Sequence, residues 1–343
     1  MKEKPLISVI VPCHNAQAFI QNCLDSLDKQ TYANTEFILV DDGSTDNTKN
    51  IIENHIKDKP KYQLIVSENV GVSTARNLGI ERSIGDFITF MDSDDMISPY
   101  HIELMCKYAL ETGADSAVID YLKVPEGKAY SEYKFQVPYG QTCETEEFDN
   151  LGALEEFLGQ KKFEFCVWNK LYYGDIIRQQ NVRFLDGCKY NEDSLFNYKF
   201  FKHSKKTVLV HWLTYLYVQR KGSLVHAPFN EYKLDAFYSL NNIVKDAYET
   251  RPDIIHYAHI MRVALSCEII YYIKFTKNYK NGAVIKKIIE YIKTDAKHLK
   301  YCKRTHRYRR VLIPLVPAVA KLLLCKRRKL DGTLPPQFEI TDK

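Results

Sequence analysis

The sequence lacks the cysteine patterns of zinc ribbons and of disulfide-stapled domains. Its nine cysteines are an odd number and form no Cys-x-x-Cys pair, so we expect reduced, mostly buried thiols. With only 14 glycines and 12 prolines, and with no segment recurring at a fixed period, low-complexity, fibrous and solenoid proteins are excluded. The 343 residues are 45% hydrophobic and 27% charged, which indicates a globular chain large enough for two domains.

Long apolar runs are also missing. The stretch from Leu6 to Val11 is too short for the core of a signal peptide, so we expect the chain to stay in the cytoplasm. The stretch from Val311 to Cys325 is interrupted by Pro314 and Pro317, and it is shorter than the roughly 20 residues that a membrane-spanning helix needs.

Positive charge is concentrated at one place in the chain. Residues 300–330 carry eleven Lys or Arg residues and no acidic residue, so the rest of the chain is net negative. Basic clusters that flank a short apolar stretch favour peripheral attachment to an anionic membrane surface, here the inner face of the cell membrane. The alternative is a terminal helix that docks on the protein itself.

Short apolar runs alternate with helical patterns at the start of the chain. The runs LISVIV, FILV, YQLIV, FITFM and SAVI are apolar at successive positions, which is typical of parallel strands covered on both faces. We expect helices over Ala16–Gln30, Asp46–Ile56, Val72–Ser83 and Pro99–Glu111. The sequence thus predicts a doubly wound, mainly parallel α/β sheet flanked by helices, with its chemistry beyond the carboxyl ends of the strands.

This alternation breaks after residue 120. Residues 121–147 contain Pro, Gly and polar residues, and we expect them to form a long loop. We therefore divide the chain into an α/β half, a second half of the same domain, a helical C-terminal region and the basic segment, at residues 1–120, 121–227, 228–299 and 300–330.

Two acidic pairs follow predicted strands. Asp92 and Asp94 come directly after FITFM, and residues two apart in extended chain project to the same side. Mg²⁺ and Mn²⁺ commonly bind one or two carboxylates together with substrate phosphates. Asp41 and Asp42 follow FILV and could accept hydrogen bonds from a base or a ribose. The alternative for both pairs is a solvated turn that caps the next helix.

A loop that leads into a helix lies between the two pairs. Gly71 allows close approach of the backbone to a ligand, and Arg76 could reach a diphosphate through a bidentate contact. A lone Arg on a helix is usually solvated, and only its neighbours favour the functional interpretation.

Four segments resemble the successive motifs of glycosyltransferase family 2, whose members are inverting enzymes of the GT-A fold. They are ISVIVPCHNAQAFIQNCLDSLDKQTY, FILVDDGSTDNT, NVGVSTARNLGI and GDFITFMDSDD, and they span about residues 6 to 100. The resemblance implies a GT-A sheet and a nucleotide diphosphate sugar as donor. We expect this donor to be UDP-linked.

The same resemblance implies roles for particular residues. Asp41 or Asp42 would lie near the base and Arg76 near the diphosphate. Asp92 and Asp94 would form the motif that holds Mn²⁺ or Mg²⁺ and contacts the donor. Such a cation stabilises the negative charge that develops on the leaving diphosphate.

Residues of the second half resemble the acceptor side of the family. Glu192 and Asp193, in KYNEDSLFN, resemble its Glu-Asp pair, with Asp193 as the base and Glu192 as its assistant. Acids in the first turn of a helix are also favoured by the helix dipole alone. The stretch VWNKL, residues 167–171, resembles the acceptor-side segment of the family, and its Trp168 would stack on a sugar or pack in the core. Arg220 and Ser223 resemble a segment that closes over the donor diphosphate.

The expected activity is that of an inverting, metal-dependent hexosyltransferase. It would move a sugar to a hydroxyl of a glycan or lipid-linked glycan acceptor in surface polysaccharide synthesis. The alternative is a non-catalytic nucleotide-sugar or glycan-binding module, which the intact acidic residues disfavour. No nucleic-acid partner is expected, because the chain has no recognition motif for one. His211 and His226 are left out of the metal site, because a lone His is more often structural or solvated.

Overall fold

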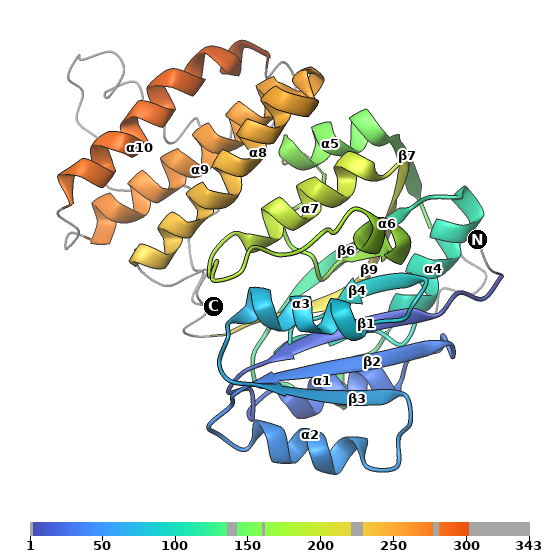
Figure 1. Cartoon of the computed structure of the whole chain (residues 1–343). Coiled ribbons are helices and arrows are strands. Elements are labelled where there is room, and N and C mark those ends of the chain that lie inside the picture. Colours follow the sequence, from blue (N-terminus) through green and yellow to red (C-terminus); the bar gives the residue numbers. More distant parts are fainter. Residues whose placement is uncertain (1–2, 136–142, 160–161, 221–228, 277–280, 302–343) are drawn as a thin grey trace. The chain divides into compact units, whose positions relative to one another are not determined.

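The computed structural model of the chain is shown in Figure 1. It describes residues 3–135, 143–159, 162–220, 229–276 and 281–301. The chain forms two compact units, which we call the α/β unit (residues 1–154 and 165–227) and the helical unit (residues 155–164 and 228–343).

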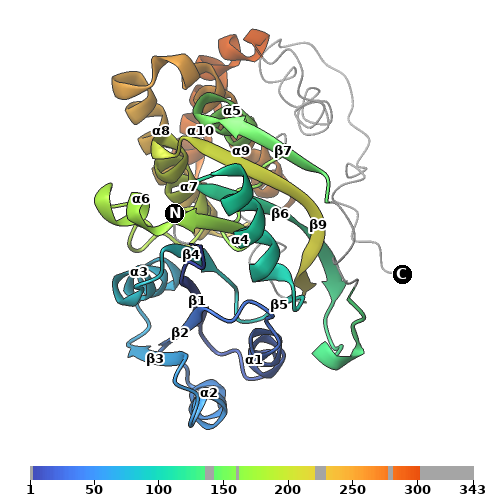
Figure 2. The ribbon, with the colours of Figure 1, turned by 90° about the vertical axis from the view of Figure 1, so that its right-hand side faces the viewer.

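The α/β unit is built on one sheet, which has nine strands among the described residues. The four strands at one edge, in the order β3-β2-β1-β4, are all parallel to their neighbours. Beyond β4 the sheet is mixed, and its order continues β8-β6-β9-β5, with β7 also paired to β9 (Figure 2). The strands are β1 (Ile7–Cys13), β2 (Thr35–Asp42), β3 (Tyr62–Ser67), β4 (Phe87–Phe90), β5 (Met96–Ile97), β6 (Ser116–Pro125), β7 (Thr145–Asp149), β8 (Lys170–Tyr173) and β9 (Lys206–Gln219).

Helices connect these strands as the sequence predicts. The first four agree with the expected helices to within a few residues, with the largest difference at the start of α1. One further helix, α5 (Asn150–Leu158), contributes residues to both units. The others are α1 (Ile20–Asp28), α2 (Thr48–Ile56), α3 (Val72–Arg82), α4 (His101–Thr112), α6 (Gly174–Gln179) and α7 (Glu192–His203).

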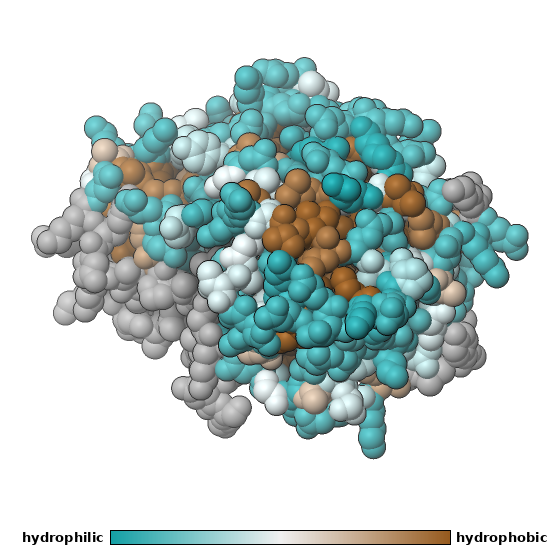
Figure 3. All heavy atoms as spheres, turned by 60° about the horizontal axis from the view of Figure 1, so that its bottom comes forward, coloured by the Kyte–Doolittle hydropathy of each residue, from teal (hydrophilic) through white to brown (hydrophobic). Residues whose placement is uncertain are grey.

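Helices cover both faces of the parallel strands. Val9 of β1 shares one core with Leu24 of α1 and Met105 of α4. Ile10 points to the opposite face. There α3 packs so closely that a Cβ atom at Gly79 would overlap the Ile10 side chain. In the view of Figure 3, hydrophilic residues surround a smaller hydrophobic area near the middle. The helices bury the parallel strands on both faces, which explains why these strands read as continuous apolar runs in the sequence.

The prediction of a long loop at residues 121–147 is wrong at both ends of this stretch. Tyr121–Pro125 continue β6 and pair with Tyr215–Gln219 of β9, after a register shift between Ile119 and Tyr121. The far end of the stretch enters β7, which also pairs with β9. Between them lies a short 3₁₀ helix, η1 (Tyr130–Glu132). Pairing with a distant strand thus overrides the local Pro and Gly signals.

The helical unit confirms the expected helical C-terminal extension. Its long helix α9 packs against α8 and α10. In the part of the chain that the structure describes, no helix is both long enough and apolar enough to cross a membrane. The basic segment lies outside the described residues from residue 302 onward. The elements are η2 (Glu231–Asp235), α8 (Ala236–Thr250), η3 (Pro252–Ile254), α9 (Ile255–Thr276), α10 (Gly282–Asp295) and η4 (Ala296–Tyr301).

Candidate active site

Three carboxylates meet in the loop that follows β4. Asp92, Asp94 and Asp95 each place one oxygen within 4.8 Å of the others. Because β4 is parallel to β1 and β1 to β2, this loop leaves the sheet at the edge where those strands also end. The structure therefore places the two predicted residues, Asp92 and Asp94, in one cluster and adds Asp95.

Asp95 is the buried member of this acidic cluster, with 1% of its surface exposed. Its Oδ2 accepts a hydrogen bond from the Tyr215 hydroxyl at 2.7 Å, and its Oδ1 accepts one from the Val218 amide at 2.7 Å. Burial raises the pKa of Asp95 well above its ordinary value. The Tyr215 oxygen also accepts from the Asp92 amide at 3.2 Å, so β9 supports the loop from behind.

Asp94 faces a cation supplied by the protein. The Arg220 Nε atom lies 2.5 Å from Asp94 Oδ2. Burial and then the negative charge of Asp92 raise the pKa of Asp94 to about 6, although Arg220 opposes the shift. The guanidinium of Arg220 also lies over the Phe19 ring, 5.6 Å from its centre. Ser223, the second residue predicted in this segment, lies outside the described residues.

The donor atoms of the acidic cluster suit a hard divalent cation, since all of them are carboxylate oxygens. Asp92 and Asp94 retain 29% and 17% exposure of their side chains, so both remain accessible to a cation and a phosphate. Both oxygens of Asp95 are engaged by β9. The residues present therefore fit Mg²⁺ or Mn²⁺ on Asp92 and Asp94, with Asp95 behind them.

Arg76 of α3 joins the acidic cluster to the start of α7. It is 3% exposed. Its Nη2 donates to Asp92 Oδ1 at 2.9 Å, and its Nη1 donates to Glu192 Oε1 at 2.9 Å and Asp193 Oδ1 at 2.8 Å. Burial acts to lower the pKa of Arg76, but the three carboxylates outweigh it and raise that pKa. The predicted contact between Arg76 and a diphosphate stays a prediction.

Asp193 lies at the second residue of α7, after Asn191 in the left-handed conformation (φ 62°). Its Oδ2 accepts a hydrogen bond from the Val167 amide at 3.3 Å. Burial raises the pKa of Asp193 to about 7, while Arg76 opposes the shift and Glu192 adds to it. The side chain keeps 16% exposure. A carboxyl group that titrates near neutrality and still reaches solvent has the properties of a general base.

The pair after β2 has two different environments. Asp42 Oδ1 accepts from the Ser67 hydroxyl at 2.9 Å and the Val70 amide at 2.6 Å, and Asp42 Oδ2 accepts from the Gly71 amide at 2.7 Å. Asp42 therefore shapes the loop that enters α3. Asp41 is also buried, and its Oδ1 has no hydrogen-bond partner among the described residues. A buried carboxylate oxygen without a hydrogen-bond donor is uncommon in folded proteins.

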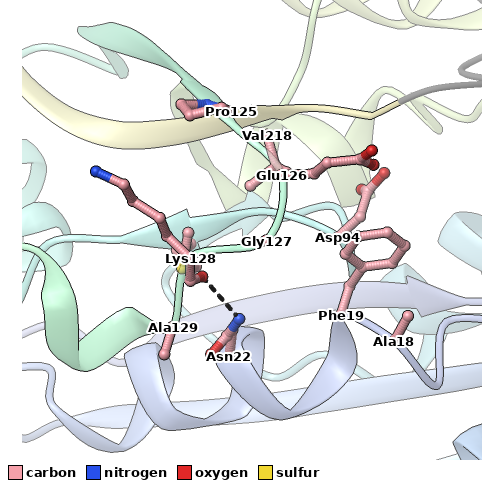
Figure 4. Close-up of a pocket in the computed structure, with 11 residues that line it drawn as sticks. Ala18, Phe19, Asn22, Asp94, Pro125, Glu126, Gly127, Lys128, Ala129 and Val218 are labelled. Carbon is pink, nitrogen blue, oxygen red and sulfur yellow. Dashed lines mark hydrogen bonds between the residues drawn. The ribbon is translucent and has the colours of Figure 1, made fainter.

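A cavity of about 530 Å³ adjoins Asp94 (Figure 4). Asn22 of α1 fixes one wall, because its side chain donates to Lys128 O at 3.2 Å and accepts from the Tyr130 amide at 3.0 Å. Figure 4 shows the carboxylates of Asp94 and Glu126 on the same side of the cavity. The lining consists of Ala18, Phe19, Asn22, Asp94, Met96, Pro125, Glu126, Gly127, Lys128, Ala129 and Val218.

Trp168 packs in an aromatic cluster and is 7% exposed. Its ring stacks on Tyr215 at 4.3 Å and on Tyr217 at 5.5 Å between ring centres, and Tyr121 meets it edge-on at 4.8 Å. This packing favours the core role of Trp168 over sugar stacking.

His211 contacts other acids than those of the cluster. Its Nδ1 lies 3.0 Å from Asp120 Oδ2 and its Nε2 lies 3.0 Å from Glu146 Oε1. The hydrogen bond with Glu146 is the main cause of its raised pKa. His226 lies outside the described residues.

Sequence reasoning assigned no role to three residues of the site. Asp95 could have been found, because it directly follows Asp94 in MDSDD. Lys170 lies in the stretch VWNKL, which resembles the acceptor side of the family, but no role of its own followed from the sequence. Tyr215 carried no signal, because it lies 120 positions away from Asp95, whose carboxylate it holds.

Comparison with known proteins agrees with these observations. Residues 8–169 match the family model for glycosyltransferase family 2. The putative glycosyltransferase EpsH of Bacillus subtilis is 33% identical over 263 residues, which cover 73% of this chain and 74% of EpsH. The chain belongs to glycosyltransferase family 2. The glycosyltransferase GlyA of Streptococcus pneumoniae is 34% identical over 222 residues; the match covers 64% of this chain but only 31% of GlyA.

A solved structure supports the fold. The crystal structure of S. aureus TarS, residues 1–349, in complex with UDP-GlcNAc has a TM-score of 0.66 to this chain. The match covers 96% of this chain and 94% of that one, at 19% sequence identity. This likeness confirms the predicted GT-A arrangement of sheet and helices.

Proposed function

We propose that the chain is an inverting, metal-dependent glycosyltransferase that uses a nucleotide diphosphate sugar. One observation carries the proposal: Arg76 ties Asp193, whose pKa lies near neutrality, to Asp92 of the acidic cluster. A proton acceptor and a cluster suited to a cation therefore share one guanidinium group, the first at Nη1 and the second at Nη2. Transfer of a sugar needs both, one at the attacking hydroxyl and one at the leaving diphosphate.

The proposed reaction is a single displacement at the anomeric carbon of the donor sugar. The acceptor oxygen forms a bond to this carbon, and the bond from this carbon to the phosphate oxygen breaks. The proton of the acceptor hydroxyl passes to the Asp193 carboxylate, and the nucleoside diphosphate leaves. Glu192, beside Asp193 on α7, orients the acceptor. Attack from the face opposite the leaving group inverts the configuration.

The donor is proposed to lie across the carboxyl ends of the strands. Asp92 and Asp94 would hold Mn²⁺ or Mg²⁺, which neutralises charge on the diphosphate when bound. Arg220 is proposed to leave Asp94 and to contact the diphosphate when the donor binds. Ser223 and Arg76 are also proposed to contact the donor. We propose that Asp41 or Asp42 lies near the base. UDP is favoured as the nucleotide because TarS, which shares the fold, binds UDP-GlcNAc.

The acceptor is proposed to be a glycan or lipid-linked glycan of a surface polysaccharide. Residues 300–330, with eleven basic and no acidic residues, would hold the enzyme on the anionic inner face of the cell membrane. In this arrangement the enzyme works in the cytoplasm at the membrane surface, where a lipid-linked acceptor is accessible.

A panel of nucleotide sugars tests this function. In the presence of Mn²⁺ or Mg²⁺, we expect the purified chain to hydrolyse one donor or to transfer its sugar. We expect EDTA to reduce this turnover about 100-fold or more. Added Mn²⁺ should restore it. A donor that binds with no turnover under any condition would instead favour the non-catalytic binding module.

A further inference from the structure

We propose that Lys170 is a positioning residue that holds the base Asp193 in its reactive state, acting through the turn formed by residues 165–169. This inference rests on the proposed function, because it assumes that Asp193 accepts the proton of the acceptor. Lys170 lies at the start of β8, and no family motif quoted above assigns it a role.

Lys170 is fully buried, with 0% exposure. Its Nζ donates to the Cys166 carbonyl at 2.6 Å and to Asn169 Oδ1 at 2.9 Å. The Cys166 thiol also donates to Asn169 Oδ1, at 3.3 Å. Burying an ammonium group is costly unless hydrogen bonds compensate for the lost water. An apolar side chain would serve packing alone better, so the charge at this position needs another explanation.

The turn that Lys170 holds is also fixed from two other elements. Asn169 Nδ2 donates to the Ile119 carbonyl of β6 at 3.0 Å. Asn197 Nδ2 of α7 donates to the Phe165 carbonyl at 2.6 Å. These bonds tie the turn to β6 and α7, and its Val167 amide donates to Asp193 Oδ2 at 3.3 Å. Residues 165–169 thus present a fixed donor to the base.

The two oxygens of Asp193 have separate partners. Oδ1 accepts from Arg76 at 2.8 Å, and Oδ2 accepts from the Val167 amide at 3.3 Å. Loss of Lys170 would remove the 2.6 Å hydrogen bond to the Cys166 carbonyl, which also accepts from Asn197 Nδ2 at 3.5 Å. We expect this loss to loosen the turn and so to shift the Val167 amide away from Asp193 Oδ2. Small displacements of a catalytic group cost large factors in rate, because the reacting atoms must be aligned.

Lys170 also acts on Asp193 by its charge. The charged groups that face Asp193 are Arg76 of α3, Glu192 of α7, Asp92 after β4 and Lys170 of β8. Burial and the two acids raise the pKa of Asp193, whereas Arg76 and Lys170 lower it. Removing Lys170 therefore leaves the carboxyl group protonated up to a higher pH, and a protonated carboxyl group cannot accept a proton.

The test compares Lys170→Met with Lys233→Met. Lys233, in the helical unit, is 1% exposed and serves as a matched control for loss of a buried lysine. For Lys170→Met we expect kcat to fall about 10- to 100-fold with the donor KM unchanged. We also expect the acidic limb of its kcat/KM profile to move to higher pH, because Lys170 is one of the two cations that lower the pKa of Asp193. Lys233→Met should keep the parent profile.

A second variant guards against loss of folding. Lys170→Gln keeps an N–H donor without the charge, and donor binding and thermal melting report whether it is folded. We expect its acidic limb to move as in Lys170→Met, with a smaller loss of kcat. An unmoved limb in the folded variants, or a donor KM that rises in step with the loss of kcat, would overturn the role of Lys170. Full activity of Asp193→Asn would instead overturn the proposed base itself.

Discussion

Each unit places an aspartate beside a buried arginine, and the two carboxyl groups behave in opposite ways. In the helical unit, Asp295 is 0% exposed and accepts from Arg262 Nε at 2.6 Å and Arg262 Nη2 at 2.9 Å, while His259 Nδ1 lies 2.8 Å away. Burial alone would raise the pKa of Asp295, but the bonds from His259 and Arg262 hold it below its ordinary value. In the α/β unit, the pKa of Asp193 rises to about 7.

The difference lies in how many acids share one arginine. Arg262 gives two N–H groups to Asp295 alone, whereas Arg76 divides two nitrogens among Asp92, Glu192 and Asp193. A bidentate pair satisfies its carboxylate and stabilises the fold. A shared arginine leaves surplus negative charge, which a proton or a cation can neutralise. The comparison separates a structural ion pair from one suited to chemistry.

Neutralising each aspartate should have the largest effect on turnover. Asp193→Asn removes the proposed proton acceptor, so we expect turnover to fall about 10²- to 10⁴-fold with donor affinity retained. Asp295→Asn should keep turnover per folded molecule. Steady-state transfer and donor titration on both variants check this, and equal losses of turnover in the two would erase the distinction.

Stability should show the opposite order. Asp295→Asn leaves a buried Arg262 without its counter-charge, so we expect a loss of about 3–5 kcal/mol in the free energy of unfolding of the helical unit. Asp193→Asn removes one of three crowded acids and should leave stability unchanged or raised. Denaturant unfolding measures both. The distinction fails if Asp193→Asn destabilises the protein as much as Asp295→Asn does.

The two aspartates should also affect activity and stability in different ranges of pH. Because Asp193 must be deprotonated, we expect kcat/KM to fall about tenfold per unit as pH drops below about 7. The raised pKa of Asp193 favours the native state at low pH, and this contribution is lost as pH rises through about 7. The lowered pKa of Asp295 stabilises the native state at pH values above the ordinary pKa of an aspartate. This contribution is lost as the pH falls through the lowered pKa of Asp295 in the folded protein.

Stability and activity profiles against pH check both expectations. Activity should decline near neutrality while the helical unit is still folded, and unfolding should follow only in stronger acid. In Asp295→Asn the acid-dependent part of the unfolding free energy should shrink. A rate profile that stays flat from about pH 6 to about pH 8 would contradict a base with a pKa near neutrality.

Local patterns in the sequence predicted most of the fold, because the parallel strands are buried on both faces and read as apolar runs. The same patterns placed Asp92 and Asp94 after a strand, where topology brings side chains together. The pairing of Tyr121–Pro125 with β9 was not predictable, because it depends on residues some ninety positions away. Arg76 is similar: two of its three partners lie 116 and 117 positions further along the chain.

Binding of Mn²⁺ in the presence of UDP, followed by electron paramagnetic resonance, tests the acidic cluster most directly. We predict that the purified chain takes up Mn²⁺, that the double variant Asp92→Asn, Asp94→Asn loses this uptake, and that Asp295→Asn retains it. Undiminished uptake by the double variant would contradict a metal site on Asp92 and Asp94.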